Sequence, residues 1–220
     1  MLSECVLISP LIQRILSLPM STLGAAEISA RGDVNVSRMS KNRLTGPGGF
    51  IDISSCTRDV YFMAPFTAVG LEVECSQDGG GSLKILSEGK VKKFVSEVYE
   101  KTFSGDEAVR RGQFVYFVTE RAVFRRTSSH DVIELIEIAP GVDLQKDILD
   151  LMEFTPAISP NLKVMDPRIF RDEKMNAASD FFGSLDGMIT LHLLSFAGPP
   201  NKLTCRTPLI FINRTMQLSR

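Results

Sequence analysis

The sequence predicts a globular domain that mixes β-strands with helices, of the α/β or α+β class. Residues Val60–Ala64 are apolar and aromatic throughout, which is typical of a strand buried on both faces of a sheet. A capped, amphipathic helix is expected to begin after Asp143. Three more strand-like runs, joined by short turns, precede it at residues 114–119, 122–125 and 132–138.

Turn signals divide the first half of the chain into hairpins. Ala25–Ser29 and Val34–Ser37 flank Arg31-Gly32-Asp33, which predicts a first hairpin. Leu71–Cys75 and Leu83–Leu86 flank a glycine-rich turn and predict a second one. The basic, alternating stretch Lys90–Val95 indicates a sheet edge or a solvated face.

The helix expected after Asp143 places its apolar residues on one stripe. These are Leu144, Ile148, Leu151 and Met152. We expect Pro156 and Pro160 to end this helix, because proline cannot continue it. Beyond Asp186 no acidic residue occurs, so the tail differs in composition, with one possible strand at Leu209–Ile212.

Composition excludes several classes of protein. Of the 220 residues, 44% are hydrophobic and 23% charged, as in folded domains and unlike disordered chains. The formal net charge of −1 argues against a binder of nucleic acid through a basic surface. No apolar run is long enough to span a bilayer. The four cysteines are scattered, and neither they nor the two histidines are spaced as metal ligands are. We therefore expect no metal site and no disulfide framework, and we expect the protein to lie in a reducing compartment.

The segment Gly46–Asp52 (Gly-Pro-Gly-Gly-Phe-Ile-Asp) is the strongest candidate for a site. Glycines let a backbone approach a ligand closely and adopt positive φ. If Phe50 begins a helix, the free N–H groups around Gly48 and Gly49 suit an anion or a developing oxyanion. The segment matches neither the phosphate loop nor the dinucleotide pattern. A tight turn between two elements is the alternative.

Several phrases, in one order between about residues 22 and 172, resemble the C-terminal half of class I coenzyme A transferases. The similarity is strongest to acetate/propionate CoA-transferases related to succinyl-CoA:3-ketoacid CoA-transferase. The phrases are residues 23–27 (LGAAE), 32–38 (GDVNVSR), 46–54 (GPGGFIDIS), 70–74 (GLEVE), 88–95 (EGKVKKFV), 102–105 (TFSG), 116–124 (YFVTERAVF), 135–144 (LIEIAPGVDL) and 158–163 (ISPNLK).

The resemblance implies an open, largely parallel α/β sheet with flanking helices, and a two-step exchange of CoA. In the family a glutamate attacks an acyl-CoA thioester, and the resulting anhydride becomes a glutamyl-CoA thioester that passes CoA to a second acid. The oxyanion-stabilising groups map onto the backbone N–H of Gly49, with Gly48 beside it, and onto Asn35. For Asn35 the alternative is a strand-end residue that bonds its own turn.

The resemblance also implies CoA as a substrate, with no permanently bound cofactor and no metal. The CoA-contacting residues are expected to be Gly46, Gly48, Gly49, Phe66 and Thr67. The family loop that corresponds to Phe66–Gly70 has glycine where this chain has Val69. A β-branched residue tolerates positive φ poorly, so we expect this loop to be reshaped. Lys90–Lys93 could attract CoA phosphates or be a solvated basic face.

The nucleophilic glutamate of the family has no counterpart in this sequence. Glu4, Glu27, Glu72 and Glu74 do not stand in the expected Ser/Glu-Ser/Asn-Gly-like context. Glu27 is expected to be a surface carboxylate, and Glu120-Arg121 a turn with an ion pair. We therefore expect no complete transfer by this chain alone. It is a truncated gene product, a degenerate paralogue, or one piece that meets another chain.

These inferences give a provisional layout of three parts: an unassigned apolar segment (1–19), a CoA-transferase C-terminal-half domain (20–172) and a divergent tail (173–220), for which disorder is one alternative. Expected partners are acyl-CoA and a short-chain carboxylate, together with an N-terminal-half chain or a second copy, but neither nucleic acid nor membrane. Short-chain fatty acid metabolism or ketone body catabolism, in the cytoplasm or the mitochondrial matrix, would be the setting. The competing hypotheses are a non-catalytic CoA-binding module and a structural remnant.

Overall fold

A computed structural model describes residues 18–76, 80–177 and 180. The chain divides into two compact units, Met1–Arg171 and Asp172–Arg220. Every helix and strand named below lies in the first unit.

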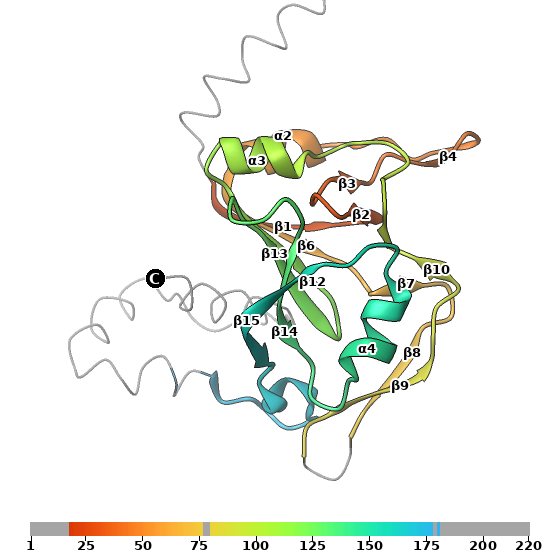
Figure 1. The fold of residues 1–220 in the computed structure, drawn as a ribbon, viewed down its shortest axis with the longest axis vertical. Coiled ribbons are helices and arrows are strands. Elements are labelled where there is room, and N and C mark those ends of the chain that lie inside the picture. Colours follow the sequence, from red (N-terminus) through yellow and green to blue (C-terminus); the bar gives the residue numbers. More distant parts are fainter. Residues whose placement is uncertain (1–17, 77–79, 178–179, 181–220) are drawn as a thin grey trace, which may run out of the picture. The chain divides into compact units, whose positions relative to one another are not determined.

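The first unit is built on a six-stranded sheet (Figure 1). The strands follow one another across it in the order β1 (Leu18–Gly24), β6 (Thr57–Met63), β12 (Phe114–Val118), β13 (Ala122–Arg126), β14 (Glu134–Ile138) and β15 (Ala157–Val164). Only β13 runs against its neighbours, and the other adjacent pairs are parallel. The open, largely parallel sheet that the resemblance implied is therefore confirmed.

Smaller elements surround this sheet. Short strands form four additional sheets in the described part of the chain: β2 (Glu27–Ser29) with β3 (Val34–Asn35) and β11 (Phe94–Val95), β4 (Arg38–Ser40) with β5 (Arg43–Leu44), β7 (Thr67–Ala68) with β10 (Val91–Lys92), and β8 (Glu72–Cys75) with β9 (Leu83–Ser87). The helical elements are α2 (Phe50–Cys56), α3 (Gly105–Arg110), α4 (Leu144–Asp147) and the 3-10 turns η1 (Leu149–Leu151) and η2 (Pro167–Phe170).

One face of the sheet carries the apolar core. Phe62, Phe117 and Phe124 are neighbours across β6, β12 and β13 and are fully buried. The first residue of α2, Phe50, stacks on Phe62 with ring centroids 5.7 Å apart. Ala108 of α3, and Ile148 and Met152 beside η1, belong to the same apolar cluster. The helices therefore pack on one face, and this packing fixes the loops at the ends of the strands.

The opposite face of the sheet carries more polar side chains. Tyr61 and Tyr116 are paired across β6 and β12, and their rings stack with centroids 4.9 Å apart. Further along the same face, Arg125 forms an ion pair with the buried Glu134 over 2.8 Å. Burial raises the pKa of the Tyr61 hydroxyl.

The predicted hairpins and the central strands are confirmed. The segments around Gly32 pair as antiparallel β2 and β3, and β8 pairs with β9. The predicted strand at Val60–Ala64 corresponds to β6, whose residues Val60–Phe62 are buried on both faces. Lys90–Val95 forms two short strands, β10 and β11, at the margins of small sheets.

The helix predicted after Asp143 is shorter than expected. Asp143 caps it as predicted, because its Oδ1 accepts a hydrogen bond from the Lys146 N–H over 2.8 Å. The helix ends at Asp147, and Ile148, with φ −124° and ψ −68°, separates it from η1. The apolar stripe still faces the core through Ile148 and Met152.

The prediction that Pro160 ends a helix is wrong, since this residue lies within the edge strand β15. The register between β14 and β15 shifts between Leu135 and Glu137. Proline lacks an N–H donor and is accepted in a sheet at edges and irregularities, and this position offers both. The strands β1 and β15 and the helix α3 were not predicted.

The provisional domain boundaries remain a prediction. Strand β1 begins at Leu18, two residues before the expected start at residue 20. The segment 1–17, the strand expected at 209–212 and most of the tail after residue 173 lie outside the described residues. None of the helices in the described part has the length and apolar character that a bilayer crossing needs.

Candidate functional site

The glycine turn links β5 to α2 and is exposed to solvent. Gly46 and Gly48 adopt positive φ values of 78° and 54°, which glycine reaches without strain. The turn is anchored from both ends, because Gly46 N–H donates to the Ser37 carbonyl over 3.1 Å and Phe50 N–H donates to the Pro47 carbonyl over 3.0 Å. As predicted, Phe50 begins a helix.

The N–H groups of Gly48 and Gly49 have no hydrogen-bond partner among the described residues. Gly49 occupies the cap position of α2, and no side chain caps this helix. Two adjacent backbone donors are therefore open to solvent on a short turn whose shape is fixed. Such donors can bind an oxygen atom that gains negative charge during a reaction.

The structure places Asn35 beneath this turn, with a side chain that is fully buried and fully used. Its Nδ2 donates to Glu27 Oε2 and to the Arg38 carbonyl, each over 2.7 Å. Its Oδ1 accepts hydrogen bonds from the N–H groups of Ser37 and Arg38 over 3.1 and 3.2 Å. This geometry corresponds to the alternative reading of Asn35, in which it bonds its own turn. The Ser37 carbonyl in turn holds Gly46, so Asn35 supports the glycine turn from below.

Glu27 is not the free surface carboxylate that the sequence suggested. It is half-buried, and its Oε2 also accepts a hydrogen bond from the Tyr99 N–H over 2.8 Å. A carboxylate that ties β2 to two other segments is a structural group. Glu72 and Glu74, by contrast, are exposed along β8.

Phe66 and Thr67, predicted to contact CoA, are buried where β6 leads into β7. The ring of Phe66 stacks on Phe94 with centroids 4.8 Å apart. The Thr67 hydroxyl donates to Glu88 and accepts from the Gly89 N–H over 3.0 Å. Neither side chain is free to meet a ligand, so any contact from this loop must come from its exposed tip at Val69 and Gly70.

Val69, which stands where the family loop has glycine, adopts a left-handed backbone conformation. Its φ is 64°, and that of Gly70 is 93°. That valine reshapes the loop relative to the family stays a prediction; in this chain the loop holds a β-branched residue in the left-handed region.

Arg121 is the buried charge that sequence reasoning placed in an ordinary turn. This residue lies in the turn that joins β12 to β13, and its side chain is 0% exposed. Its guanidinium pairs with both oxygens of Glu88, over 2.8 and 3.1 Å, and with Glu120 over 2.7 Å. Burial alone would raise the pKa of Glu88, but hydrogen bonds from Arg121 and Thr67 outweigh it and lower that pKa. The ion pair predicted for this turn is present, although the role of Glu88 was missed.

A signal for this cluster exists in the sequence. Two apolar strands flank Glu120 and Arg121, so at least one of these charges must be buried, and a buried arginine requires carboxylate partners. The sequence does not indicate that one partner comes from Glu88, 33 residues earlier.

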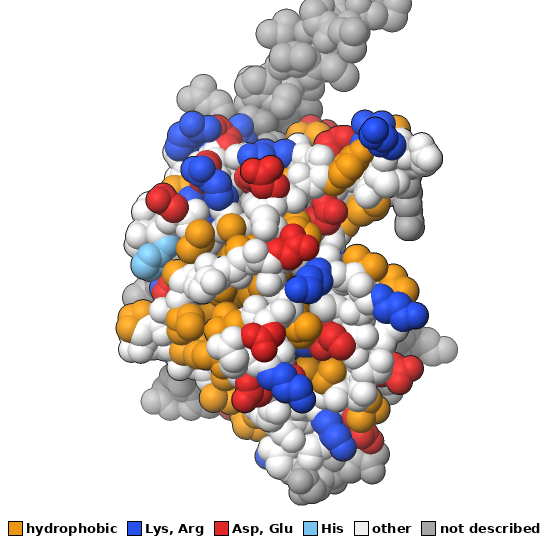
Figure 2. Space-filling model, turned by 45° about the vertical axis from the view of Figure 1, so that its right-hand side comes forward, with side chains coloured by type: hydrophobic (Ala, Val, Ile, Leu, Met, Phe, Trp, Pro, Cys, Tyr) orange, Lys and Arg blue, Asp and Glu red, His pale blue; other side chains and the backbone are white. Residues whose placement is uncertain are grey.

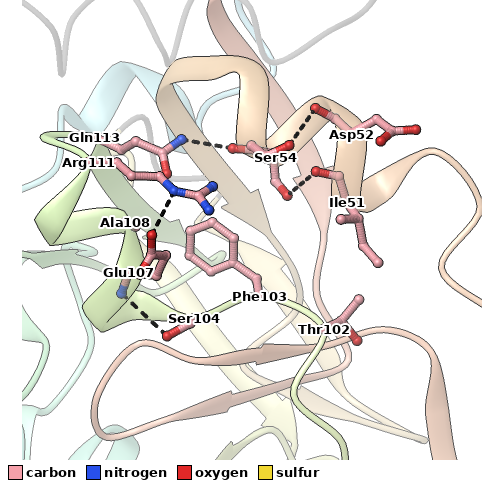
Figure 3. Close-up of a pocket in the computed structure, with 11 residues that line it drawn as sticks. Ile51, Asp52, Ser54, Thr102, Phe103, Ser104, Glu107, Ala108, Arg111 and Gln113 are labelled. Carbon is pink, nitrogen blue, oxygen red and sulfur yellow. Dashed lines mark hydrogen bonds and ion pairs between the residues drawn. The ribbon is translucent and has the colours of Figure 1, made fainter. Parts of the chain in front are cut away.

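A cleft of about 380 Å³ separates α2 from α3 (Figure 3). Its walls include Ile51 and Asp52 from α2, Glu107 from α3, and Arg111, which directly follows α3. Two of its polar side chains are already paired: Arg111 Nε donates to Glu107 over 2.9 Å, and Gln113 Nε2 donates to the Ser54 carbonyl over 2.8 Å. None of the site residues predicted from sequence lines this cleft.

Charges do not collect into a patch of one sign on the face seen in Figure 2, where acidic and basic side chains alternate. The exposed Lys90 and Lys92 differ from Lys93, whose Nζ donates to the Ala25 carbonyl over 2.8 Å. Burial lowers the pKa of Lys93. In the described part of the chain, no group of His, Cys, Asp or Glu side chains is arranged to hold a metal ion.

Known proteins resemble the chain over most of its described length. It is 49% identical over 158 residues to the acetate CoA-transferase YdiF of Escherichia coli, and 46% identical over 160 residues to the caffeate CoA-transferase of Acetobacterium woodii. These matches cover 72% and 71% of this chain. The chain is homologous to part of the class I CoA-transferases. No family model matches it.

Solved structures agree with this assignment. A thioester complex of the E. coli acyl-CoA transferase with CoA superposes with a TM-score of 0.68 at 47% identity, over 73% of this chain. The glutaconate CoA-transferase of Acidaminococcus fermentans, at 15% identity and a TM-score of 0.51, shares the fold. The CoA-transferase similarity is partial, since this chain spans 29% of the length of the curated relatives and 30% of the solved E. coli chain.

Proposed function

We propose that this chain is the part of a CoA-transferase that stabilises negative charge while CoA moves between a short-chain acyl-CoA and a carboxylic acid. The acid would be acetate, propionate or a 3-keto acid. The identity of 49% over 158 residues to an acetate CoA-transferase carries the proposal. Coenzyme A is then a substrate of the reaction.

The glycine turn supplies the chemical part of the proposal. When a carboxylate attacks a thioester, the carbonyl oxygen gains negative charge, and the N–H groups of Gly48 and Gly49 are placed to donate to it. Gly46 and Asn35 contribute by holding the turn, through Ser37. We assign Phe66 and Thr67 to the support of their loop, because their side chains are buried.

The nucleophile is expected to come from protein outside the described residues. Glu27 is held by Asn35 and Tyr99, while Glu72 and Glu74 stand exposed on a peripheral hairpin, and Glu4 lies outside the described residues. A glutamate on an N-terminal-half segment, in the same or another polypeptide, would attack the acyl-CoA. The thioester carbonyl carbon would bond to its oxygen and the CoA thiolate would leave. That thiolate would then attack the glutamyl carbonyl and release the acid.

A second candidate function is a non-catalytic CoA or acyl-CoA binding module. The lack of a suitably placed carboxylate among the described residues favours it. Location in the cytoplasm or the mitochondrial matrix, and a role in short-chain fatty acid or ketone body metabolism, would follow from the substrates.

The test is to measure CoA binding by calorimetry, and transfer of CoA from acetyl-CoA to propionate, with the purified chain. Gly49→Val places a β-branched side chain at the donor and should abolish binding or turnover. Gly24→Ala is the matched control, since an added Cβ there meets no atom within 4 Å. Transfer is measured both with the chain alone and after addition of the N-terminal half of a homologous CoA-transferase, which brings the glutamate. Turnover that appears on this addition and is lost in Gly49→Val supports the proposed function, whereas CoA binding without turnover in both cases supports the second candidate. An affinity for CoA that is identical in Gly49→Val and the original chain would reject the role of the glycine turn.

A further inference from the structure

A buried cluster of charges lies directly against the loop Phe66–Gly70. At its centre is Arg121, which is 0% exposed and pairs with Glu88 and Glu120. A fourth hydrogen bond runs from Arg121 Nη1 to the Asp147 carbonyl over 3.1 Å, at the end of α4. The planar guanidinium donates in several directions at once, which the ammonium of lysine cannot do with the same geometry.

Each carboxylate of the cluster reaches one residue of the loop. Glu120 Oε2 accepts a hydrogen bond from the Phe66 N–H over 2.9 Å. Glu88 Oε1 accepts one from the Thr67 hydroxyl. Arg121 thus determines where two successive residues of the loop lie, although it donates no hydrogen bond to either of them.

The ring of Phe66 completes this arrangement. The guanidinium carbon of Arg121 lies 4.9 Å from the centre of that ring, and Phe94 stacks on Phe66 with centroids 4.8 Å apart. A cation–π contact between two buried side chains strengthens the hold of Arg121 on the loop.

The tip of the loop is held in a conformation that the chain would not adopt unaided. Val69 has φ 64° and is 65% exposed, so no local packing of its side chain accounts for that backbone. Its carbonyl accepts a hydrogen bond from the Lys90 N–H over 3.0 Å. Gly89 packs so closely that an added Cβ would lie 2.6 Å from the Ala68 carbonyl oxygen. Strained backbone of this kind persists only where surrounding contacts enforce it, and it concentrates at ligand-binding segments.

The location of the loop also indicates a ligand. Strands β1, β6 and β12 are parallel, so their carboxyl ends lie at one edge of the sheet. The loop follows β6 at this edge, and Glu120 and Arg121 follow β12. Open α/β sheets bind their ligands outside the carboxyl ends of the strands. The N–H groups of Val69 and Gly70 have no partner among the described residues and are available there.

We propose that Arg121 is a positioning residue, which through Glu88 and Glu120 holds the loop Phe66–Gly70 in the shape that meets the acyl-CoA substrate. The proposal rests on the proposed function, because it takes CoA as the ligand of this edge. The tip presents backbone donors and one apolar side chain, Val69, to a molecule that carries both amide and thioester oxygens.

The experiment compares hydrogen exchange of the loop amides with CoA affinity in the full chain. The variants are Arg121→Met, which keeps bulk and removes all donors, and Arg121→Lys, which keeps the charge but not the planar fork of donors. Arg125→Met is the matched control, since Arg125 lies on β13, which directly follows Arg121 in the chain, and pairs with the buried Glu134, whereas no contact among the described residues joins it to the loop. If Arg121→Met does not fold, Glu88→Gln takes its place in both measurements, because it is a smaller change to the same cluster.

We expect exchange at Phe66 and its neighbours to rise at least tenfold in Arg121→Met and CoA affinity to fall about tenfold, with Arg121→Lys closer to Arg121→Met than to the original chain. In Arg125→Met the melting temperature should fall without either change. A looser loop with unchanged CoA affinity, or a lower melting temperature with unchanged loop exchange, overturns the proposal. If the original chain binds no CoA, the proposed function fails for the chain alone, and the exchange result still decides whether Arg121 holds the loop.

Discussion

Asn35 Nδ2 donates a hydrogen bond to Glu27 Oε2 over 2.7 Å, joining the two strands of the hairpin around Gly32 at their open end. From the sequence, Asn35 was a candidate oxyanion donor and Glu27 was expected to be a surface carboxylate. Because the side chains of Asn35 and Glu27 bond each other, neither is free to contact a ligand. The backbone N–H groups of Gly48 and Gly49 are therefore the donors that we propose for the chemistry.

The first prediction concerns this contact. Asn35→Ala should lower the free energy of unfolding by on the order of 3 kcal/mol, because it leaves buried backbone groups and one Glu27 oxygen without their partner. Urea unfolding followed by circular dichroism measures the loss. Asn161→Ala, at an exposed position on β15, is the control and should change stability little. A stable Asn35→Ala protein would restore Asn35 as a candidate for direct ligand contact.

The second prediction uses the left-handed Val69. Val69→Gly should raise the free energy of unfolding by about 1 kcal/mol, since relief of backbone strain outweighs the added flexibility of glycine in the unfolded chain. Val73→Gly, in the exposed strand β8, should lower stability instead. Parallel thermal melts would show opposite signs, and equal losses in both variants would contradict the strain.

The third prediction concerns acid stability. The pKa of Glu88 is lowered in the folded state from an ordinary value of 4.5, so its stabilising contribution is complete above that value and is lost as the pH falls through the folded pKa. Glu88→Gln should be less stable than the original chain at pH 7, and this difference should shrink below about pH 4.5. Melting temperatures between pH 3 and 7 test it, with the exposed Glu72→Gln as control. A difference that stays constant with pH would argue against the ion pair.

The fourth prediction concerns Tyr61, whose buried hydroxyl has no hydrogen-bond partner within the described part of the chain. Tyr61→Phe removes a polar group that loses hydration on folding, and it should raise the free energy of unfolding by about 1 kcal/mol while the stack on Tyr116 is kept. Tyr99→Phe, at a half-exposed site, should be neutral. Destabilisation of Tyr61→Phe by denaturant titration would mean that the hydroxyl is in fact satisfied.

Much of the fold could be predicted because its determinants are local. The apolar run at Val60–Phe62 and the turn residues around Gly32 specify β6 and the first hairpin without reference to distant parts of the chain. Edge elements were missed because their pattern is weak. Strand β15 contains Pro160 and a register shift, and α3 has only six residues. Its cap, Ser104, whose hydroxyl accepts from the Glu107 N–H, was the one available signal.

The site was less predictable than the fold, since its contacts join segments that are far apart in sequence. The glycine turn and its position before a helix follow from the residues themselves. The burial of Phe66 and Thr67 depends on Glu88, Glu120 and Arg121, which lie on other elements. Only the assembled sheet brings these three charges together.

The residues that hold the loop Phe66–Gly70 lie far from it in sequence, and this has a consequence for the order of folding. The hydrogen bond between Phe66 and Glu120 spans 54 residues, and the ion pair between Glu88 and Arg121 spans 33. Contacts between distant residues close long loops and form late compared with local ones. During synthesis, the turn at Val69 therefore stays unstructured until the chain has grown past Arg121, and a nascent fragment that ends before β13 would present a pliable segment in place of a shaped one.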